Sequence, residues 1–301
     1  MIGKTETQTV QTLENRLKAS GNGNAKRSVE ELAAHVLSCK PLEIYFREPT
    51  PEQAVELEAL IVRAERGEPI QYIIGHVDFR GLEIRCDRRA LIPRPETERL
   101  VEEVLTSKVK SLKSPRICDV CTGTGCIGLS LAHELPTATV TAVDISPEAL
   151  ALARENAEQL GLSDRFQTLE NNLLEGFAVD EASSLVDQRQ NAAATLEKQF
   201  DIVVSNPPYI LSNVWKNLEP CVRDFEPQLA LDGGADGFDL IRPLAEQAFA
   251  VLKPGGGLFL EIGYDQGDAV FQCLENAAFT DVRVVKDLSG LDRIVCGRKS
   301  Q

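Results

Sequence analysis

Apolar residues in the first quarter of the chain recur at helical spacing. Ser28–Glu31 has the form of a capping box, in which a serine and an acidic residue cap a helix start, and apolar residues follow it at intervals of three and four. Thr50–Gln53 is a second such box with proline at the first helical position, and Gly67 is expected to end that helix. The pattern predicts a small helical domain over residues 1–75.

Residues 76–98 follow a different pattern. Apolar and polar positions alternate loosely on either side of Gly81, which predicts a short β-hairpin. Two prolines then hold Leu91–Glu98 in an extended path, because proline restricts its own backbone and that of the preceding residue. We expect this region to link the helical domain to the rest of the chain, with a helix running from about Glu96 to Lys108.

From Ile117 onward, short apolar runs typical of buried strands alternate with helical stretches. The predicted strands are Ile117–Val120, Thr139–Asp144, Phe166–Leu169, Phe200–Ser205, Gly257–Ile262, Val282–Val285 and Ile294–Cys296. The predicted helices are Ile127–Glu134, Pro147–Gly161, Gly237–Leu252 and Gln266–Ala277. This alternation indicates an α/β domain over residues 99–301 with a mostly parallel sheet covered on both faces. Residues 178–199 are polar and lack an apolar stripe, so we expect an inserted loop there.

Composition and charge narrow the possible partners. The chain is 43% apolar and 26% charged, has no apolar run long enough to span a membrane, and begins without the apolar core of a signal peptide. We therefore expect a cytoplasmic protein without membrane contact. The net charge is −14, whereas a protein that follows nucleic-acid phosphates usually has a basic face, so no direct nucleic-acid target is expected. The arginines within residues 80–94 have acidic neighbours, which indicates a solvated face.

The eight cysteines do not form a recognisable metal pattern. Cys118 and Cys121 have the spacing of half a zinc site or of a redox pair. A second such pair is missing, and the three histidines are scattered along the sequence. We interpret the cysteines as small, reduced, mostly buried residues and expect no metal.

A glycine-rich stretch marks a candidate cofactor site. Asp119–Gly128 has the order strand, glycine loop, helix, and Gly123, Gly125 and Gly128 fit the dinucleotide fingerprint. Asp144, at the end of the next strand and 19 residues after Gly125, provides a carboxylate for a ribose diol. Both NAD and S-adenosylmethionine are bound in this geometry, and the loop alone does not distinguish them.

The end of a later strand favours methyl transfer. Phe200–Ser205 is followed by Asn-Pro-Pro-Tyr, which puts a side-chain amide, a rigid backbone carbonyl and an aromatic ring at a strand end. The nitrogen of a planar NH2 group is a poor nucleophile because its lone pair is delocalised. Asn206 and Pro207 offer two oxygens that accept hydrogen bonds from such a group and orient its nitrogen, while Tyr209 packs against it. The step then needs alignment and neither a metal nor a covalent intermediate.

These motifs resemble the HemK/PrmC family, the protein-(glutamine-N5) methyltransferases of peptide-chain release factors. The resemblance covers about residues 28–298. The stretches that carry it are Gly67–Gly75 (GEPIQYIIG), Leu91–Glu98 (LIPRPETE), Asn206–Tyr209 (NPPY), Val222–Pro227 (VRDFEP), Ala230–Leu231, Gly233–Gly237, and Glu261–Gly263 with Gln266.

The resemblance implies a Rossmann-like methyltransferase domain with a small N-terminal helical domain that binds substrate. It implies that Asn206, Pro207, Pro208 and Tyr209 bind the substrate amide. The cofactor S-adenosylmethionine is then held by Cys121, Thr122, Gly123, Thr124, Gly125, Asp144, Asn172, Leu173 and Asn206. The sequence departs from the family pattern at Cys121, where glycine is usual, and at residues 171–173, where the family often has an aspartate and an aromatic residue.

The resemblance also implies the substrate, which is the glutamine of the Gly-Gly-Gln loop in class I release factors. One alternative is a glutamine methyltransferase of a ribosomal protein, which is not expected to share the PRPETE motif. The other is a DNA adenine-N6 methyltransferase. The latter needs a basic recognition element, which residues 1–75 lack. An NAD oxidoreductase would need His, Lys or Tyr residues arranged for hydride transfer, and no such arrangement stands out in this sequence. A non-enzymatic binding module does not explain why glycine loop, acid and NPPY occur in this order.

Overall fold

The computed structural model describes residues 3–177 and 200–301, and the chain forms two compact units. The smaller unit comprises Met1–His76 and Leu218–Glu226, and the larger comprises Val77–Asn217 and Pro227–Gln301. The inserted loop expected at residues 178–199 lies outside the described residues.

The smaller unit is helical, as predicted. Its elements are α1 (Gly3–Ala19), α2 (Ala25–Val36), η1 (Pro41–Phe46), α3 (Pro51–Glu65), α4 (Ile70–Ile74) and α9 (Pro220–Arg223). Leu17, Leu32 and Ile61 from three of these helices are fully buried against one another and form the centre of this unit's core. No helix in the described part of the chain is both long and apolar enough to span a bilayer.

One of the two predicted capping boxes is confirmed and the other is wrong. Thr50 accepts a hydrogen bond from the Gln53 backbone, and the Gln53 side chain accepts one from the Thr50 backbone. Ser28, in contrast, lies inside α2 and is buried, because that helix already begins at Ala25. The Ser28 hydroxyl donates to the Asn22 side chain instead of capping a helix end.

The larger unit contains a two-stranded hairpin and a seven-stranded sheet of order β5-β4-β3-β6-β7-β9-β8. The hairpin consists of β1 (His76–Phe79) and β2 (Leu82–Arg85), and the sheet of β3 (Arg116–Val120), β4 (Thr139–Asp144), β5 (Phe166–Glu170), β6 (Phe200–Ser205), β7 (Leu252–Glu261), β8 (Thr280–Lys286) and β9 (Asp292–Arg298). Neighbouring strands from β5 to β7 pair in parallel, and β9 is antiparallel to both of its neighbours. The predicted mostly parallel α/β sheet is confirmed.

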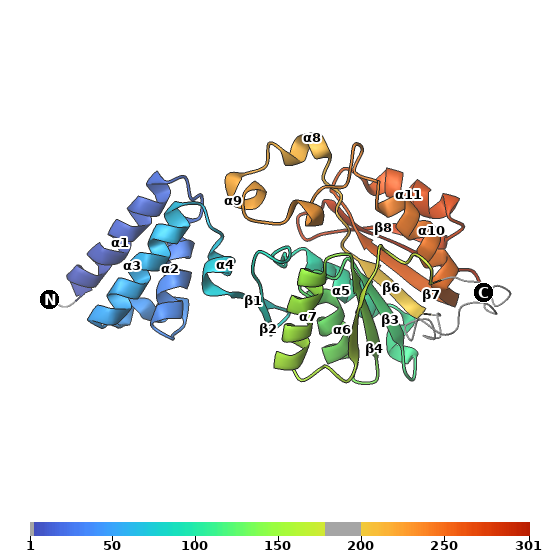
Figure 1. Cartoon of the computed structure of the whole chain (residues 1–301), viewed down its shortest axis with the longest axis horizontal. Helices are drawn as coiled ribbons and strands as arrows, with labels where there is room; N and C mark the ends of the chain where they lie inside the picture. The colour runs from blue at the N-terminus through green and yellow to red at the C-terminus, as the bar shows by residue number, and fades with distance from the viewer. Residues whose placement is uncertain (1–2, 178–199) are drawn as a thin grey trace. The chain divides into compact units, whose positions relative to one another are not determined.

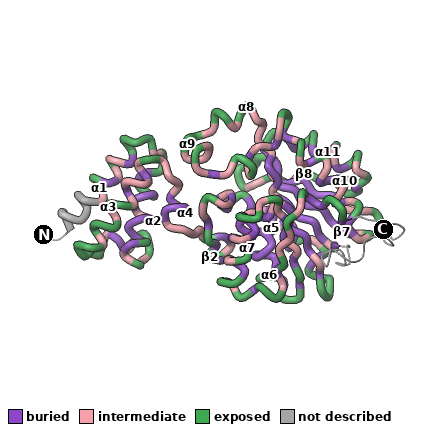
Figure 2. The backbone as a smooth tube through the Cα atoms, viewed as in Figure 1, coloured by how far each residue is buried: buried purple, intermediate pink, exposed green. Residues whose placement is uncertain are grey.

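Helices cover both faces of this sheet (Figure 1). They are α5 (Thr97–Thr106), η2 (Lys108–Ser111), α6 (Cys126–Glu134), α7 (Pro147–Gln159), α10 (Ile241–Val251) and α11 (Gly267–Asn276). The short helices α8 (Ser212–Trp215) and η4 (Gln228–Ala230) contribute no buried residue to either core. Strand side chains alternate between the two faces: Ile202 and Val204 join the core under α5, α6 and α7, whereas Val203 joins the core under α10 and α11. Most residues of the central strands β3 and β6 are accordingly buried (Figure 2).

Two predicted boundaries around α10 and β7 are wrong. The helix begins at Ile241 and not at Gly237, because Asp236 accepts a hydrogen bond from the Phe238 backbone and holds a turn there. The strand begins at Leu252 and not at Gly257, because Leu252 pairs with Phe200 across the sheet. Tertiary pairing therefore overrides the turn preference of the intervening proline and glycines.

Close packing of α6 on the sheet depends on Gly128. A Cβ atom at this position would lie 2.9 Å from Asp119 Oδ2, 2.9 Å from Val140 Cγ1 and 3.0 Å from the Phe166 ring. All three neighbours are buried, so none moves aside easily. The helix therefore approaches the strands more closely than a larger residue allows.

We predict that Gly128→Ala lowers the free energy of unfolding by about 1–3 kcal/mol, because the added methyl group overpacks this contact. Urea unfolding followed by circular dichroism measures the change. The exposed His133 on the same helix provides the control, and His133→Ala should change stability by less than about 0.5 kcal/mol. Equal stability of Gly128→Ala and wild type would contradict the packing argument.

Candidate active site

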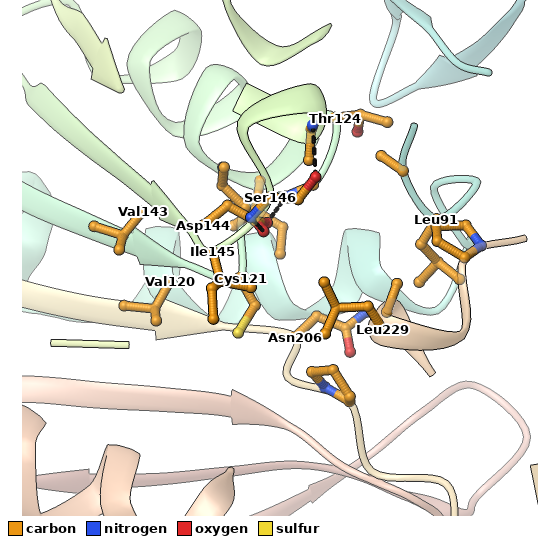
Figure 3. A pocket seen from close by; sticks show the side chains of 18 of the residues that line it. Leu91, Val120, Cys121, Thr124, Val143, Asp144, Ile145, Ser146, Asn206 and Leu229 are labelled. Carbon is orange, nitrogen blue, oxygen red and sulfur yellow. Dashed lines mark hydrogen bonds between the residues drawn. The ribbon is translucent and has the colours of Figure 1, made fainter. Parts of the chain in front are cut away.

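A cavity lies at the carboxyl ends of β3, β4 and β6. β3 pairs in parallel with β4 on one side and β6 on the other, so the segments after all three strands meet at one edge of the sheet. This is the topological switch point, where open α/β sheets bind ligands. Figure 3 shows Asp144 at the end of β4, Ile145 after it, and Asn206 after β6 facing the same space.

The glycine loop after β3 is held by a buried carboxylate. Asp119 is fully buried, and its Oδ2 accepts hydrogen bonds from the Thr122 hydroxyl (2.6 Å) and the Gly128 backbone (2.9 Å). Burial raises the pKa of Asp119 to about 7, and these two hydrogen bonds oppose the rise. One side chain thus fixes both the loop and the start of α6.

Cys121 begins this loop in a left-handed conformation. Its φ is 58°, a region that L-residues other than glycine seldom adopt, which explains why glycine suits this position in the related family. The thiol lines the cavity, and burial raises its pKa well above the usual value. The cysteine is therefore a neutral, apolar part of the wall.

Asp144 links the loop to the end of β4. Its Oδ2 accepts a hydrogen bond from the Gly123 backbone at 2.9 Å, and its Oδ1 accepts one from the Ser146 backbone at 3.0 Å. Burial raises the pKa of this carboxyl, and the backbone hydrogen bonds lower it. Because each carboxylate oxygen accepts more than one hydrogen bond, both retain capacity for a ligand in the cavity.

The segment after β5 forms another wall. Asn172 and Leu173 both line the cavity, as the sequence predicted they would if they held a cofactor. The Asn172 amide donates to the Glu175 side chain, which does not line the cavity, and Leu173 is 6% exposed. Ile145, across from them on the β4 side, adds an exposed apolar surface to the same cavity.

Asn206 brings an amide to the opposite wall. Asn206 and Pro208 line the cavity, and Asn206 Nδ2 donates to the Thr97 hydroxyl at 3.3 Å. Within residues 3–177 and 200–301, no group donates a hydrogen bond to Asn206 Oδ1 or to the Pro207 carbonyl. The Asn206 Oδ1 in the cavity wall and the carbonyl of the next residue, Pro207, therefore both lack a donor in this part of the chain.

The loop that carries Asn206 is braced by the later motifs. The Gln266 side chain donates to the Tyr209 carbonyl at 3.2 Å, and the backbones of Ile210 and Gly233 are hydrogen-bonded at 2.7 Å. A Cβ atom on Gly233 would lie 2.7 Å from Tyr209 Cα, so glycine is required for this approach. The stretches after NPPY thus hold the loop rigid.

Three of the predicted site residues lie behind the cavity rather than on its surface. Among the described residues, the cavity is not lined by Gly125, Pro207 or Tyr209. Tyr209 packs against the core under α10 and α11, and burial raises the pKa of its hydroxyl to about 12. Cys121, Thr122, Gly123, Thr124, Asp144, Asn172, Leu173, Asn206 and Pro208 do line it.

Sequence reasoning missed the wall formed by residues 89–97. Arg89, Leu91, Arg94 and Thr97 line the cavity, and the arginines were expected on a solvated face. Arg89 instead pairs with Glu155 on α7 at 2.6 Å as well as with its neighbour Asp87. The signal that could have found it is the apolar run Leu91–Pro93 at the start of LIPRPETE, which a purely exposed linker does not need.

The same cavity has a further wall at residues 227–230, which follows the part of the chain assigned to the smaller unit. Leu229 lines it while remaining 57% exposed. In the described part of the chain, His, Cys, Asp and Glu side chains form no group of three suited to a metal ion. The cavity is thus apolar, with a few convergent polar groups, as is typical of small-molecule sites.

Known proteins with similar sequences share this organisation. The family model described as the PrmC N-terminal domain matches residues 8–75, and one described as a methyltransferase domain matches residues 111–265. A methyltransferase from Pyrococcus furiosus superposes with a TM-score of 0.50 at 16% identity, covering 73% of this chain and 90% of the other, which shows the fold alone.

Curated relatives are similar along nearly the whole chain. A release factor glutamine methyltransferase from Koribacter versatilis is 38% identical over 286 residues, which is 94% of each chain. Another from Caulobacter vibrioides is 40% identical over 274 residues, covering 91% of this chain and 88% of the relative. At this identity and coverage, the chain belongs to the release factor glutamine methyltransferase family.

Proposed function

We propose that this protein transfers a methyl group from S-adenosylmethionine to the side-chain amide nitrogen of a glutamine in class I release factors. One observation carries the proposal: a glycine loop with a strand-end carboxylate shares a single cavity with Asn206. The first group of residues suits a nucleoside cofactor and the second a planar amide.

The residues around the cavity fit S-adenosylmethionine. We propose that Asp144 binds the ribose hydroxyls, residues 121–125 hold the methionine part, and Asn172 and Leu173 contact the adenine. When bound, this cofactor supplies an electrophilic methyl group on a sulfonium. The apolar walls would accommodate the sulfonium, and Cys121, whose thiol is neutral, would not compete as a thiolate nucleophile.

The loop after β6 fits the substrate amide. We propose that Asn206 Oδ1 and the Pro207 carbonyl accept the two N–H groups of the glutamine, which orients the nitrogen towards the methyl donor. The absence of donors to both oxygens within the described residues supports this role. Pro208 and Tyr209 complete the loop, with Tyr209 holding it from behind. As the new C–N bond formed and the methyl–sulfur bond of the sulfonium broke, the cofactor would be left as a neutral thioether, and the nitrogen would become acidic and lose its proton to water.

The family assignment and charge favour a protein substrate. A net charge of −14 does not suit a phosphate-following groove. We propose that the helical region of residues 1–75 binds the release factor, and that the glutamine lies in its Gly-Gly-Gln loop, whose glycines fit a narrow cavity. All eight cysteines are free, which supports a reducing, cytoplasmic location.

Asn206→Ala should lower the turnover number by about 10²–10³, because it removes a positioned hydrogen-bond partner of the reacting group. Methyl transfer from radiolabelled S-adenosylmethionine to release factor measures it. Asn217→Ala is the matched control, since Asn217 is exposed and lies outside the cavity. Near wild-type turnover of Asn206→Ala would exclude the proposed acceptor.

Asp144→Ala should weaken S-adenosylmethionine binding at least about tenfold, because it removes a hydrogen-bonded charged group at the ribose position and also releases the glycine loop from Gly123. Calorimetry with cofactor alone gives the dissociation constant. Asp164→Ala removes the same charge from an exposed position away from this cavity and should leave binding unchanged. Equal dissociation constants for all three proteins would show that the ribose lies elsewhere.

The substrate itself is tested by comparing three acceptors: intact release factor, a release factor with Gln→Ala in the Gly-Gly-Gln loop, and an adenine-containing DNA duplex. We expect labelling of the intact protein alone, because only it offers the planar amide at the tip of a glycine-flanked loop. Mass spectrometry locates the added methyl group. Labelling of the Gln→Ala protein or of the duplex above background would refute the proposed substrate.

A further inference from the structure

The Asn206 amide belongs to a chain of polar contacts that runs into the core. Its Nδ2 donates to Thr97, the first residue of α5, and Thr97 in turn hydrogen-bonds the carboxyl group of Glu261, the last residue of β7. Thr97 is 2% exposed and Glu261 is 1% exposed. The three residues come from distant parts of the sequence, and only Asn206 and Thr97 line the cavity among them.

The chemistry of these groups fixes the direction of each hydrogen bond. An ionised carboxylate only accepts, so the Thr97 hydroxyl must donate its one proton to Glu261. The Thr97 oxygen then has only lone pairs left for Asn206, and the amide must present its NH2 group to Thr97. The opposite end of the amide, Oδ1, is consequently left for the cavity.

We propose that Glu261, acting through the Thr97 hydroxyl, holds the Asn206 amide in the orientation that turns its Oδ1 towards the substrate. Both are positioning residues, since Glu261 lies behind the cavity and Thr97 acts on Asn206. The inference rests on the proposed function, in which Asn206 Oδ1 accepts a substrate N–H. With the amide reversed, NH2 would face the N–H groups of the substrate and repel them.

The Glu261 carboxyl group is buried with only part of its hydrogen-bonding capacity used. Its Oε2 has no hydrogen-bond partner in the described part of the chain, although it is buried. A buried carboxylate with an unpaired oxygen lowers stability relative to a neutral residue of the same shape. A role in directing the amide gives a reason for its presence that folding does not.

The charge of Glu261 depends on several neighbouring groups. Burial raises its pKa to about 7, while the Thr97 hydrogen bond opposes the rise. The charged or titratable groups that face it are Arg293 on β9, Arg94 and Glu96 before α5, Tyr209 after β6 and Cys126 at the start of α6. The two arginines favour the ionised form and Glu96 disfavours it.

Protonation removes the directional constraint. As the pH falls through about 7, Glu261 becomes neutral and gains a proton that it can donate to Thr97. Thr97 is then able to donate to Asn206 Oδ1, and the amide orientation is no longer determined. Turnover should therefore decrease on the acid side of this pH.

Thr97→Val and Thr97→Ser test the relay, with methyl transfer to release factor as the assay. The valine variant keeps the shape and removes the hydroxyl, and should lower the turnover number about 10-fold to 100-fold through misorientation of Asn206. Calorimetry should give a cofactor dissociation constant within about twofold of wild type, because the loop and Asp144 are unchanged. The serine variant should restore most of the turnover. Thr106→Val on the same helix is the matched control, since Thr106 is exposed.

Glu261→Gln tests the charge. We expect turnover to be lowered and to lose its dependence on pH between about 6 and 8, while urea unfolding shows equal or greater stability. A glutamine variant that is less stable but as active as wild type would identify Glu261 as a structural residue. Wild-type turnover in Thr97→Val, with Asn206→Ala inactive, would refute the relay alone and leave the proposed function standing.

A measurement that needs no substrate separates the two proposals. The side-chain NH2 resonances of Asn206 in 15N-labelled protein should shift with a midpoint near pH 7 in wild type and not in Glu261→Gln. If no release factor is methylated but this titration is seen, the relay stands and the proposed substrate fails. If the resonances do not titrate in wild type, the relay is refuted whatever the activity.

Discussion

Parallel pairing of β3 with both β4 and β6 is the constraint on which the site depends. Val120 lies opposite Val143 and Ser205 in register, so the segments that follow all three strands leave the sheet at one edge. The glycine loop, Asp144 and Asn206 are 23 to 85 residues apart in sequence (121 to 144, and 121 to 206), yet they line one cavity. Apolar side chains on both faces of these strands fix the register, because a shift by one residue would exchange the two cores.

Buried carboxylates organise both halves of the cavity. Asp119 holds the glycine loop through Thr122 and the Gly128 backbone, and Glu261 contacts Thr97 beneath Asn206. Burial raises the pKa of each to about 7, which reflects the cost of a charge in an apolar core. A buried carboxylate lowers the stability of the fold. Asp119 lies next to the glycine loop and Glu261 next to the Thr97 that contacts Asn206, so both of these stability costs fall beside the cavity.

Predictions from local sequence patterns were correct where contacts between residues close in the chain determine the structure. They were wrong where contacts between distant residues determine it. The Thr50 cap forms as predicted because its partners are three residues away. The predicted start of β7 was wrong because Leu252 pairs with Phe200, which is 52 residues away, and a local sequence pattern does not record such a contact. The same applies to Arg89: its acidic neighbours suggested a solvated face, but Glu155 on α7 draws it to the cavity wall.

The sequence by itself determined the α/β alternation, the helical N-terminal region, the glycine loop with Asp144 and the Asn206 loop, because periodicity and short motifs encode local geometry. Only the tertiary structure decided which of these residues face the cavity. Tyr209 is half-buried and packs against the core under α10 and α11 instead of lining the cavity, while Thr97 contacts Asn206. The physical reason is that orientation at the site is fixed by buried contacts between strands and helices far apart in the chain, and a linear pattern does not record which side chains meet.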